Sequence, residues 1–363
     1  MISQKTSRTH ARSPYMEFSK LRSSARYNLA SSGMASLPLA ELHVDISQLE
    51  INGPDSYGYP PLKQAIARRY RVPEECVVSA AGTSMSNYLA MAACVEPGEE
   101  ALFEEPTYPL LLDTARYLGI EVKRFARPPE RNFEVDLEDL ERKISSRTKL
   151  IVLCNMHNPS GALIPEATLR TVGQLAKRVG ARVMVDEVYL EMLWQRTPQS
   201  CFHLDPEVFV STHSLTKAYG LSGIRCGWVL ASPELAQRIW HIHDLHASTP
   251  VHPGELLGVI AFEKLEQIAA LQKTRLDGNR RLLRNFLESQ TVFDYFLPEH
   301  GTVIAPRVKT GDGDALAAAL RKRDISVVPG GFFEMPDRVR IGVGGPTEEV
   351  REALEALGAA LRD

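Results

Sequence analysis

Residues 211–228 read STHSLTKAYGLSGIRCGW, and they place one lysine among small and hydroxyl-bearing residues. Because glycine and serine are poor helix formers, we expect a loop whose backbone approaches a ligand closely, not an ordinary surface helix. Lys217 lies in this loop, Ser214 comes three residues before it and Arg225 comes eight residues after it. A lysine amine condenses with carbonyl groups, and a hydroxyl together with a planar guanidinium binds phosphate. The stretch therefore indicates a ligand that carries a carbonyl group and a phosphate group. Taken alone, however, such a lysine is more often a solvated residue in a flexible loop.

The composition is that of a globular protein without an electrostatic preference for nucleic acid or membranes. The chain has 363 residues, 44% of them hydrophobic and 24% charged, with a net charge of −3. This length predicts two domains, and no apolar run approaches the roughly 20 residues of a membrane span. Five scattered cysteines without a CxxC pair favour reduced thiols in the cytoplasm over disulfides or a zinc site, so we predict no metal.

The first fifteen residues are basic, and they contain Lys5, Arg8 and Arg12 but no acid. Transit peptides have this composition, but the apolar face that they need is missing. We therefore prefer a flexible arm, one that could lie across a partner subunit.

Seven short apolar segments alternate with helical patterns along the middle of the chain. They lie at 77–79, 101–103, 122–125, 150–154, 182–187, 209–211 and 227–230. This alternation predicts an α/β fold with a mostly parallel, seven-stranded sheet and helices on both faces. Long helical stretches follow Pro233, from 234 to 245 and from 255 to 288, and short strand and helix patterns complete the chain. We predict an arm and part of a small α+β domain at 1–49, a large domain at 50–250, and the rest of the small domain at 251–363.

Polar residues follow several of the predicted strands, where open parallel sheets bind ligands. Ala81, Gly82 and Thr83 begin a helix and could bind an anion through backbone N–H groups, although a plain helix cap has the same sequence. Asn158 could direct its amide at a phenolic oxygen, or simply initiate the turn before Pro159.

An acid at the end of an apolar strand also needs an explanation. Burial of the Asp186 carboxylate is costly unless the group is paired, and a protonated pyridine nitrogen is a suitable partner. Tyr189 could reach the oxygen of the same ring. The alternative role of Asp186 is to cap the segment that follows.

Four motifs in this order resemble those of one enzyme family. They are Asn158-Pro159-Ser160-Gly161, Asp186-Glu187-Val188-Tyr189, Ser214-Leu215-Thr216-Lys217 with Arg225, and Arg340-Ile341-Gly342. Together they resemble the fold-type I, pyridoxal-phosphate-dependent class I/II aminotransferases, from about residue 28 to the end. The resemblance implies pyridoxal 5'-phosphate as the cofactor.

The resemblance implies a role for each cofactor-binding residue. Lys217 would hold the cofactor as an internal aldimine and then move the proton between Cα and the cofactor. Asp186 would keep the pyridine nitrogen protonated, and Asn158 and Tyr189 would donate hydrogen bonds to the phenolate oxygen. Tyr108 would stack on the ring. The phosphate would be bound by Ala81, Gly82, Thr83, Ser214 and Arg225.

For the substrate, the resemblance implies that Arg340 and Gly33 bind the α-carboxylate and that Asn158 also belongs to the substrate-binding residues. It further implies that the enzyme is a homodimer with shared active sites. The family's tyrosine that reaches the neighbouring subunit's phosphate falls on Gly53 in this chain. Tyr57 is the nearest substitute. Further aromatic residues near the expected pocket suggest an apolar or mixed pocket, and they are Tyr15, Phe18, Tyr57 and Phe332.

The predicted activity is transfer of an amino group from an L-amino acid to a 2-oxo acid. A lyase or cyclase on the same scaffold remains the main alternative, namely a carbon–sulfur lyase, an aminocyclopropane-forming enzyme or an amino-acid cyclase. An inactive regulatory paralogue is more remote, since little chain precedes residue 28 for a DNA-binding domain. A nicotinamide dehydrogenase is disfavoured because no GxGxxG follows a strand.

Overall fold

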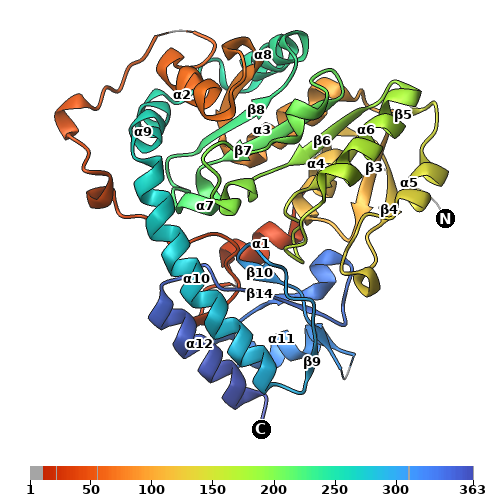
Figure 1. Ribbon diagram of the computed structural model, residues 1–363, viewed down its shortest axis with the longest axis vertical. Coiled ribbons are helices and arrows are strands. Elements are labelled where there is room, and N and C mark those ends of the chain that lie inside the picture. Colours follow the sequence, from red (N-terminus) through yellow and green to blue (C-terminus); the bar gives the residue numbers. More distant parts are fainter. Residues whose placement is uncertain (1–10, 22, 55, 310, 363) are drawn as a thin grey trace.

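A seven-stranded sheet forms the centre of the larger part of the molecule (Figure 1). The computed structural model describes residues 11–362 apart from 22, 55 and 310, so Lys5 and Arg8 of the predicted arm lie outside the described residues. The strands occur in the order β2-β8-β7-β6-β5-β3-β4. Their bounds are β2 Val77–Ala81, β3 Glu100–Glu105, β4 Glu121–Ala126, β5 Thr148–Cys154, β6 Arg182–Asp186, β7 Phe209–Ser214 and β8 Cys226–Leu230.

Only β8 runs against its neighbours in this sheet, since it pairs antiparallel with β2 and β7 while the other pairs are parallel. The predicted mostly parallel, seven-stranded sheet is therefore confirmed. Because β8 is reversed, β2 again points the same way as β7. The carboxyl ends of β2, β5, β6 and β7 consequently lie at one edge of the sheet.

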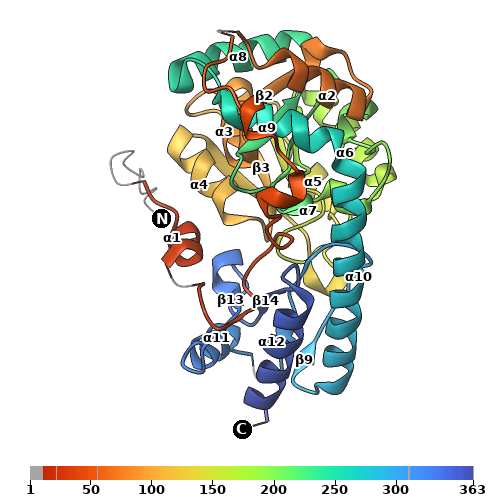
Figure 2. The ribbon, with the colours of Figure 1, turned by 90° about the vertical axis from the view of Figure 1, so that its left-hand side faces the viewer.

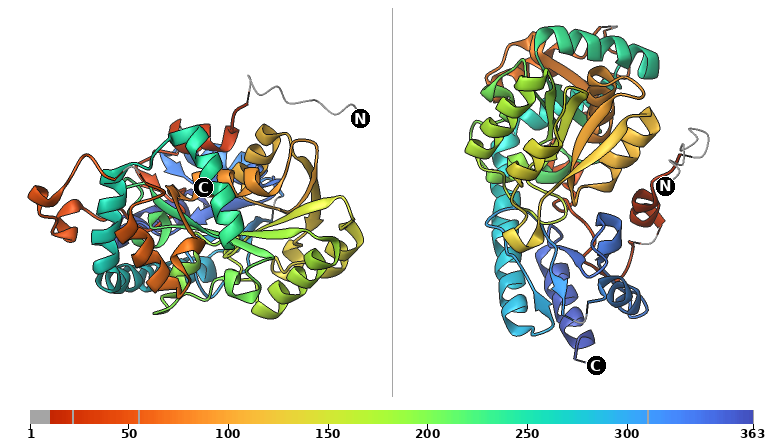
Figure 3. Two further views of the ribbon diagram at one scale, coloured as in Figure 1. Left: turned by 90° about the horizontal axis from the view of Figure 1, so that it is seen from above. Right: turned by 90° about the vertical axis from the view of Figure 1, so that its right-hand side faces the viewer.

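Helices cover both faces of the sheet (Figure 3), because alternate strand residues are buried on opposite sides. On β5, Leu150 and Val152 pack into the core beneath α3 (Gly82–Cys94), α4 (Pro109–Leu118) and α8 (Pro233–Ala247). Ile151 and Leu153 pack on the opposite face against α5 (Leu137–Lys143) and α6 (Glu166–Val179). A third cluster near β2 and β8 includes residues of α2 (Pro60–Tyr70) and α9 (His252–Glu263).

Two local predictions need correction. Thr216–Tyr219 form a short helix, α7, where we expected a loop; Gly220 ends it with φ of 69°. A Cβ atom at Gly220 would lie 2.1 Å from the Ala35 carbonyl oxygen, so the close approach that we expected of a glycine occurs at the end of this turn. The helical stretch 255–288 is divided at Lys264 into α9 and α10 (Leu265–Ser289).

Both ends of the described chain contribute to a second, smaller core (Figure 1). Leu29 is buried there among residues from 283 to 357. The short strands are β1 (Tyr27–Asn28) with β12 (Ile325–Ser326), β9 (Phe293–Asp294) with β11 (Arg307–Val308), and β10 (Val303–Ile304) with β14 (Val339–Gly342) and β13 (Val328–Pro329). The helices α10, α11 (Gly313–Arg321) and α12 (Thr347–Ala360) pack beside them. The domain boundaries after residues 49 and 250 stay a prediction.

Helix α1 (Pro14–Leu21) lies beside the main body, near α4 and the C-terminal part of the chain (Figure 2). Tyr15 anchors it, since this ring is 6% exposed and packs edge-on against Tyr108, Phe332 and Phe333. Within the described part of the chain, no helix is both long enough and apolar enough to cross a membrane.

Candidate active site

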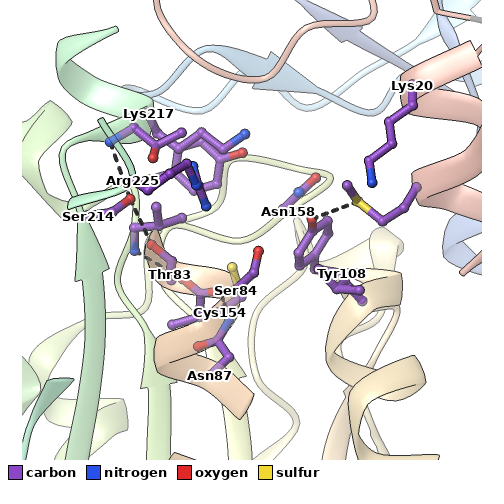
Figure 4. A pocket seen from close by; sticks show the side chains of 16 residues that line it. Lys20, Thr83, Ser84, Asn87, Tyr108, Cys154, Asn158, Ser214, Lys217 and Arg225 are labelled. Atoms are coloured by element: carbon purple, nitrogen blue, oxygen red, sulfur yellow. Dashed lines mark hydrogen bonds between the residues drawn. The ribbon is translucent and has the colours of Figure 1, made fainter. Parts of the chain in front are cut away.

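A cavity of about 580 Å³ lies at the carboxyl ends of β2, β5, β6 and β7 (Figure 4). Eight residues predicted from the sequence line it: Thr83, Tyr108, Asn158, Asp186, Tyr189, Ser214, Lys217 and Arg225. The other lining residues were not predicted: Met16, Lys20, Ser84, Asn87, Leu110, Cys154, Val188 and Thr216. The parallel strands account for this convergence, because each delivers its last residues to the same edge of the sheet.

The side chain of Lys217 extends from α7 to the cavity, where its Nζ atom donates a hydrogen bond to Ser32 Oγ at 3.0 Å. Burial, together with the positive charge of Arg340, lowers the pKa of Lys217 to about 8. A substantial fraction of this amine is therefore neutral at mildly alkaline pH, which is the form that acts as a nucleophile or base.

Asp186 presents a buried carboxylate at the floor of the cavity. Its two oxygens accept hydrogen bonds from Asn87 Nδ2 at 2.8 Å and from the Val188 backbone N–H at 3.1 Å. Burial raises the pKa of Asp186 to about 6. Among the described residues, Asp186 forms no ion pair, so a cationic group in the cavity would be stabilised here. A protonated pyridine nitrogen fits this requirement.

Asn87 lines the cavity and contacts Asp186, but it was not predicted from the sequence. It lies on the buried face of α3, one turn after Thr83, and its Oδ1 accepts a 2.5 Å hydrogen bond from Thr212 Oγ1. Thr212 thereby orients the amide so that its N–H group is directed at Asp186. The only sequence signal was an amide in a helix whose second half is apolar.

A cradle for an anion forms where α3 begins. Thr83 Oγ1 donates to Ser214 Oγ at 2.8 Å, and Arg225 donates to the carbonyls of Ala81 and Ser222 at 3.1 and 2.9 Å. Gly82 has φ of 77°, and a Cβ atom there would lie 2.2 Å from the Arg225 guanidinium. The hydroxyls, the guanidinium and the helix N-terminus fit a phosphate group.

Two groups beside the cavity can contact an aromatic ligand. The buried hydroxyl of Tyr189 lies beside Ser32 but makes no hydrogen bond of good geometry within the described residues, so a ligand oxygen would satisfy it. The half-buried ring of Tyr108 packs edge-on against Tyr15, with 5.5 Å between the centroids, and Met16 lies beside its hydroxyl. Tyr108 and Tyr189 both line the space next to Asp186.

Arg340 lies on β14 and is 1% exposed; it does not line the cavity itself but contacts Asn158, which does. It donates hydrogen bonds to Tyr15 Oη at 3.0 Å, Asn158 Oδ1 at 3.1 Å and the Ala30 carbonyl at 2.7 Å. Within the described ranges it has no carboxylate partner, and its buried Nε atom makes no hydrogen bond. Such a guanidinium suits a ligand carboxylate. Gly33 lies next to Lys217, since a Cβ atom on Gly33 would be 3.4 Å from Lys217 Cδ.

Tyr57 does not line the cavity of its own chain. It is 50% exposed, its hydroxyl donates to Asp244 at 3.2 Å, and its ring lies 5.5 Å from that of Trp240. Gly53 packs against His252, where a Cβ atom would lie 2.3 Å from the imidazole. The contact of Tyr57 with a neighbouring subunit stays a prediction.

Of the aromatic residues expected near the pocket, Tyr15, Phe18 and Phe332 form one cluster around α1. None of them lines the cavity itself; α1 contributes Met16 and Lys20 instead. These rings lie behind the lining residues, since Tyr15 packs against Tyr108.

Comparison with known proteins agrees with this geometry. The model of the family "Aminotransferase class I and II" matches residues 37–357. Capreomycidine synthase from Streptomyces vinaceus is 29% identical over 350 residues, which cover 93% of this chain and 90% of that protein. A PLP-dependent aminotransferase from Streptococcus suis 89-1591 superposes with a TM-score of 0.88 and 26% identity over 96% of each chain.

A second solved structure with the same fold is the PLP-dependent cyclase OrfR, which has a TM-score of 0.85 and 22% identity over 96% of each chain. Members of the matched family are enzymes that use pyridoxal phosphate, and the acidic floor, the anion cradle and the orphaned tyrosine hydroxyl all suit this cofactor. The chain belongs to the class I and II aminotransferase family.

Proposed function

We propose that this aminotransferase moves an amino group from an L-amino acid to a 2-oxo acid in two half-reactions, with Lys217 as the residue that links to the cofactor and carries the proton. One observation supports this most directly. The amine of Lys217, whose pKa burial lowers to about 8, and the carboxylate of Asp186 line the same cavity. The amine is suited to nucleophilic attack, and the carboxylate to binding a cation.

Each residue around the cofactor has a distinct task in this proposal. When bound, pyridoxal phosphate accepts the electrons released from Cα of the amino acid. Asp186, ionised above pH about 6, stabilises the protonated ring nitrogen. Thr83, Ser214 and Arg225 bind the phosphate, with the backbone at Ala81 and Gly82 beside them. Tyr189 donates its free hydroxyl to the ring oxygen.

The substrate would be oriented from the opposite side of the cavity. Arg340 binds its α-carboxylate, and Asn158, already hydrogen-bonded to Arg340, holds the guanidinium in place. Gly33 permits backbone approach beside Lys217. Tyr108 would pack against the cofactor ring.

A cyclase or lyase outcome is the second candidate. It is favoured by two similar proteins, capreomycidine synthase and the PLP-dependent cyclase OrfR. The residues that bind the cofactor would serve either outcome, because the fate of the Cα carbanion depends on the groups around the substrate side chain.

We also propose a cytoplasmic homodimer with shared active sites, in which Tyr57 or the basic N-terminal arm contacts the neighbouring subunit. Large apolar side chains are exposed between residues 39 and 57, at the end of α8 and just before α9, and they support a subunit contact there. They are Leu39, Ile46, Ile51, Tyr57, Leu245 and Val251. Covering these side chains would remove apolar surface from water.

The first experiment is an absorbance spectrum of the purified protein with pyridoxal phosphate, before and after addition of single L-amino acids without an oxo acid. Conversion of the cofactor to its aminated form, with release of a 2-oxo acid, supports transamination. Release of ammonia or a thiol, or formation of a cyclic product, would support the second candidate. Absence of any cofactor band would argue for a regulatory paralogue.

Replacement of the lysine provides the matching test. We expect Lys217→Ala to reduce amino-acid conversion by at least about a thousandfold, because it removes both the nucleophile and the base. The melting temperature should stay close to that of the parent, since α7 keeps its backbone contacts. Full activity of this variant would refute the assignment.

A further inference from the structure

Ser32 is the direct hydrogen-bond partner of the Lys217 amine, at 3.0 Å from Ser32 Oγ to Lys217 Nζ. It comes from the N-terminal segment, 185 residues away in sequence, and it is 6% exposed. Its neighbour Ser31 is exposed and makes no such contact. The two adjacent serines therefore differ in their relation to the reacting amine.

The backbone around Ser32 is held from three sides. Thr302 Oγ1 donates to the Ser32 carbonyl at 2.7 Å, the Met34 N–H donates to the Lys217 carbonyl at 2.8 Å, and the Ala35 N–H donates to the Gly344 carbonyl at 2.7 Å. A Cβ atom on Gly344 would lie 2.1 Å from the Gly33 carbonyl oxygen, so the two segments are in close backbone contact. The Ser32 hydroxyl is consequently presented from a rigid segment.

A hydroxyl is chemically suited to a lysine that changes its protonation state. It can accept a hydrogen bond from an ammonium and donate one to a neutral amine. A carboxylate at this position would stabilise the ammonium strongly and so weaken the amine as a base. A neutral, buried hydroxyl can orient Nζ in both states without adding a charge.

We propose that Ser32 is a positioning residue that holds the Lys217 amine in place for proton transfer at the substrate Cα, an inference that rests on the proposed function. In this step the neutral amine takes the Cα proton and becomes an ammonium that donates a hydrogen bond to Ser32 Oγ, while the electron pair of the broken C–H bond would be taken up by the cofactor. The same amine later returns the proton, so charge and atoms balance over the step.

The test compares Ser32→Ala and Ser32→Thr with Ser31→Ala as the matched control. In single-turnover reactions with an amino acid, we expect Ser32→Ala to slow conversion about tenfold, with a larger primary isotope effect for a Cα-deuterated substrate and little change in KM. Ser32→Thr should recover most of the rate, and Ser31→Ala should match the parent.

A second readout does not depend on turnover. In cofactor-free protein, the rate at which pyridoxal phosphate becomes trapped on Lys217 by borohydride should rise with pH, and this profile should move to lower pH in Ser32→Ala, because the ammonium loses an acceptor. Unchanged isotope effect and unchanged trapping profile in Ser32→Ala, at an intact melting temperature, would overturn the inference. Failure of the parent to trap the cofactor at all would instead refute the role of Lys217.

Discussion

Removal of the Asn87 amide should impair the ionisation of Asp186. In the folded protein, Asn87 donates a 2.8 Å hydrogen bond to the Asp186 carboxylate, and burial already raises the pKa of that carboxyl to about 6. A hydrogen bond to a charged group is worth about 1.5–3 kcal/mol, which is a factor of roughly ten to a hundred in the ionisation equilibrium. Asn87→Ala should therefore raise the pKa of Asp186 further.

A higher pKa of Asp186 should weaken cofactor binding near neutral pH. At pH 7 the parent Asp186 is about nine-tenths ionised, whereas the variant would be about half ionised after a tenfold loss. Affinity that depends on the ionised carboxylate is present above the pKa and is lost as the pH falls through it. The affinity of Asn87→Ala for pyridoxal phosphate should thus begin to decline at a higher pH than that of the parent.

The assay is fluorescence or absorbance titration of cofactor-free protein with pyridoxal phosphate between about pH 5.5 and 9. Thr212→Val is a graded comparison, because it leaves the Asn87 amide present but removes the hydroxyl that orients it. The difference in affinity for pyridoxal phosphate between each variant and the parent should be largest near neutral pH and should become smaller toward pH 9. If the affinity profiles of Asn87→Ala and the parent run parallel, or if the loss of affinity grows with rising pH, Asn87 does not control the ionisation of Asp186.

Three further predictions concern the anion cradle, the substrate carboxylate and the pH profile. Gly82→Ala should weaken cofactor binding about tenfold or more in the same titration, because φ of 77° disfavours alanine and the new Cβ atom meets the Arg225 guanidinium; unchanged affinity would contradict the cradle. Arg340→Lys should raise KM for amino acids roughly ten- to a hundredfold in initial-rate assays, since a bidentate pair is lost; an unaltered KM would place the carboxylate elsewhere. Trapping of cofactor on Lys217 should accelerate as pH rises through about 8, as stopped-flow mixing can measure, and a profile flat from pH 6 to 9 would be inconsistent with a titrating amine.

The strands were predictable from the sequence because most of them are buried on both faces. Leu150–Cys154 is a continuous apolar run, and both of its faces lie in separate cores. Around Lys217, the high glycine and serine content led us to predict a loop, whereas the segment forms a helical turn that Gly220 ends. Its short length explains the error, because tertiary contacts can impose one turn that local propensity disfavours.

The motif residues were also accessible from the sequence, since chemistry requires them at fixed spacing from Lys217. The family that they indicated is confirmed, and their individual roles stay predictions. Contacts across long sequence separations were not accessible. Asn87 reaches Asp186 over 99 residues, and Ser32 reaches Lys217 over 185. Neither residue has a local pattern that distinguishes it from an ordinary buried amide or a turn serine.

The α/β sheet and the family could be inferred from the sequence alone, because burial periodicity and motif spacing are local properties of the chain, and the groups that would hold pyridoxal phosphate could be predicted from the same motifs. The neutral groups that contact Lys217 and Asp186 became known only from the folded chain, as did the position of Tyr57 outside the cavity of its own chain. A pKa or the direction of an amine depends on groups within a few ångströms, and folding brings those groups from distant parts of the chain.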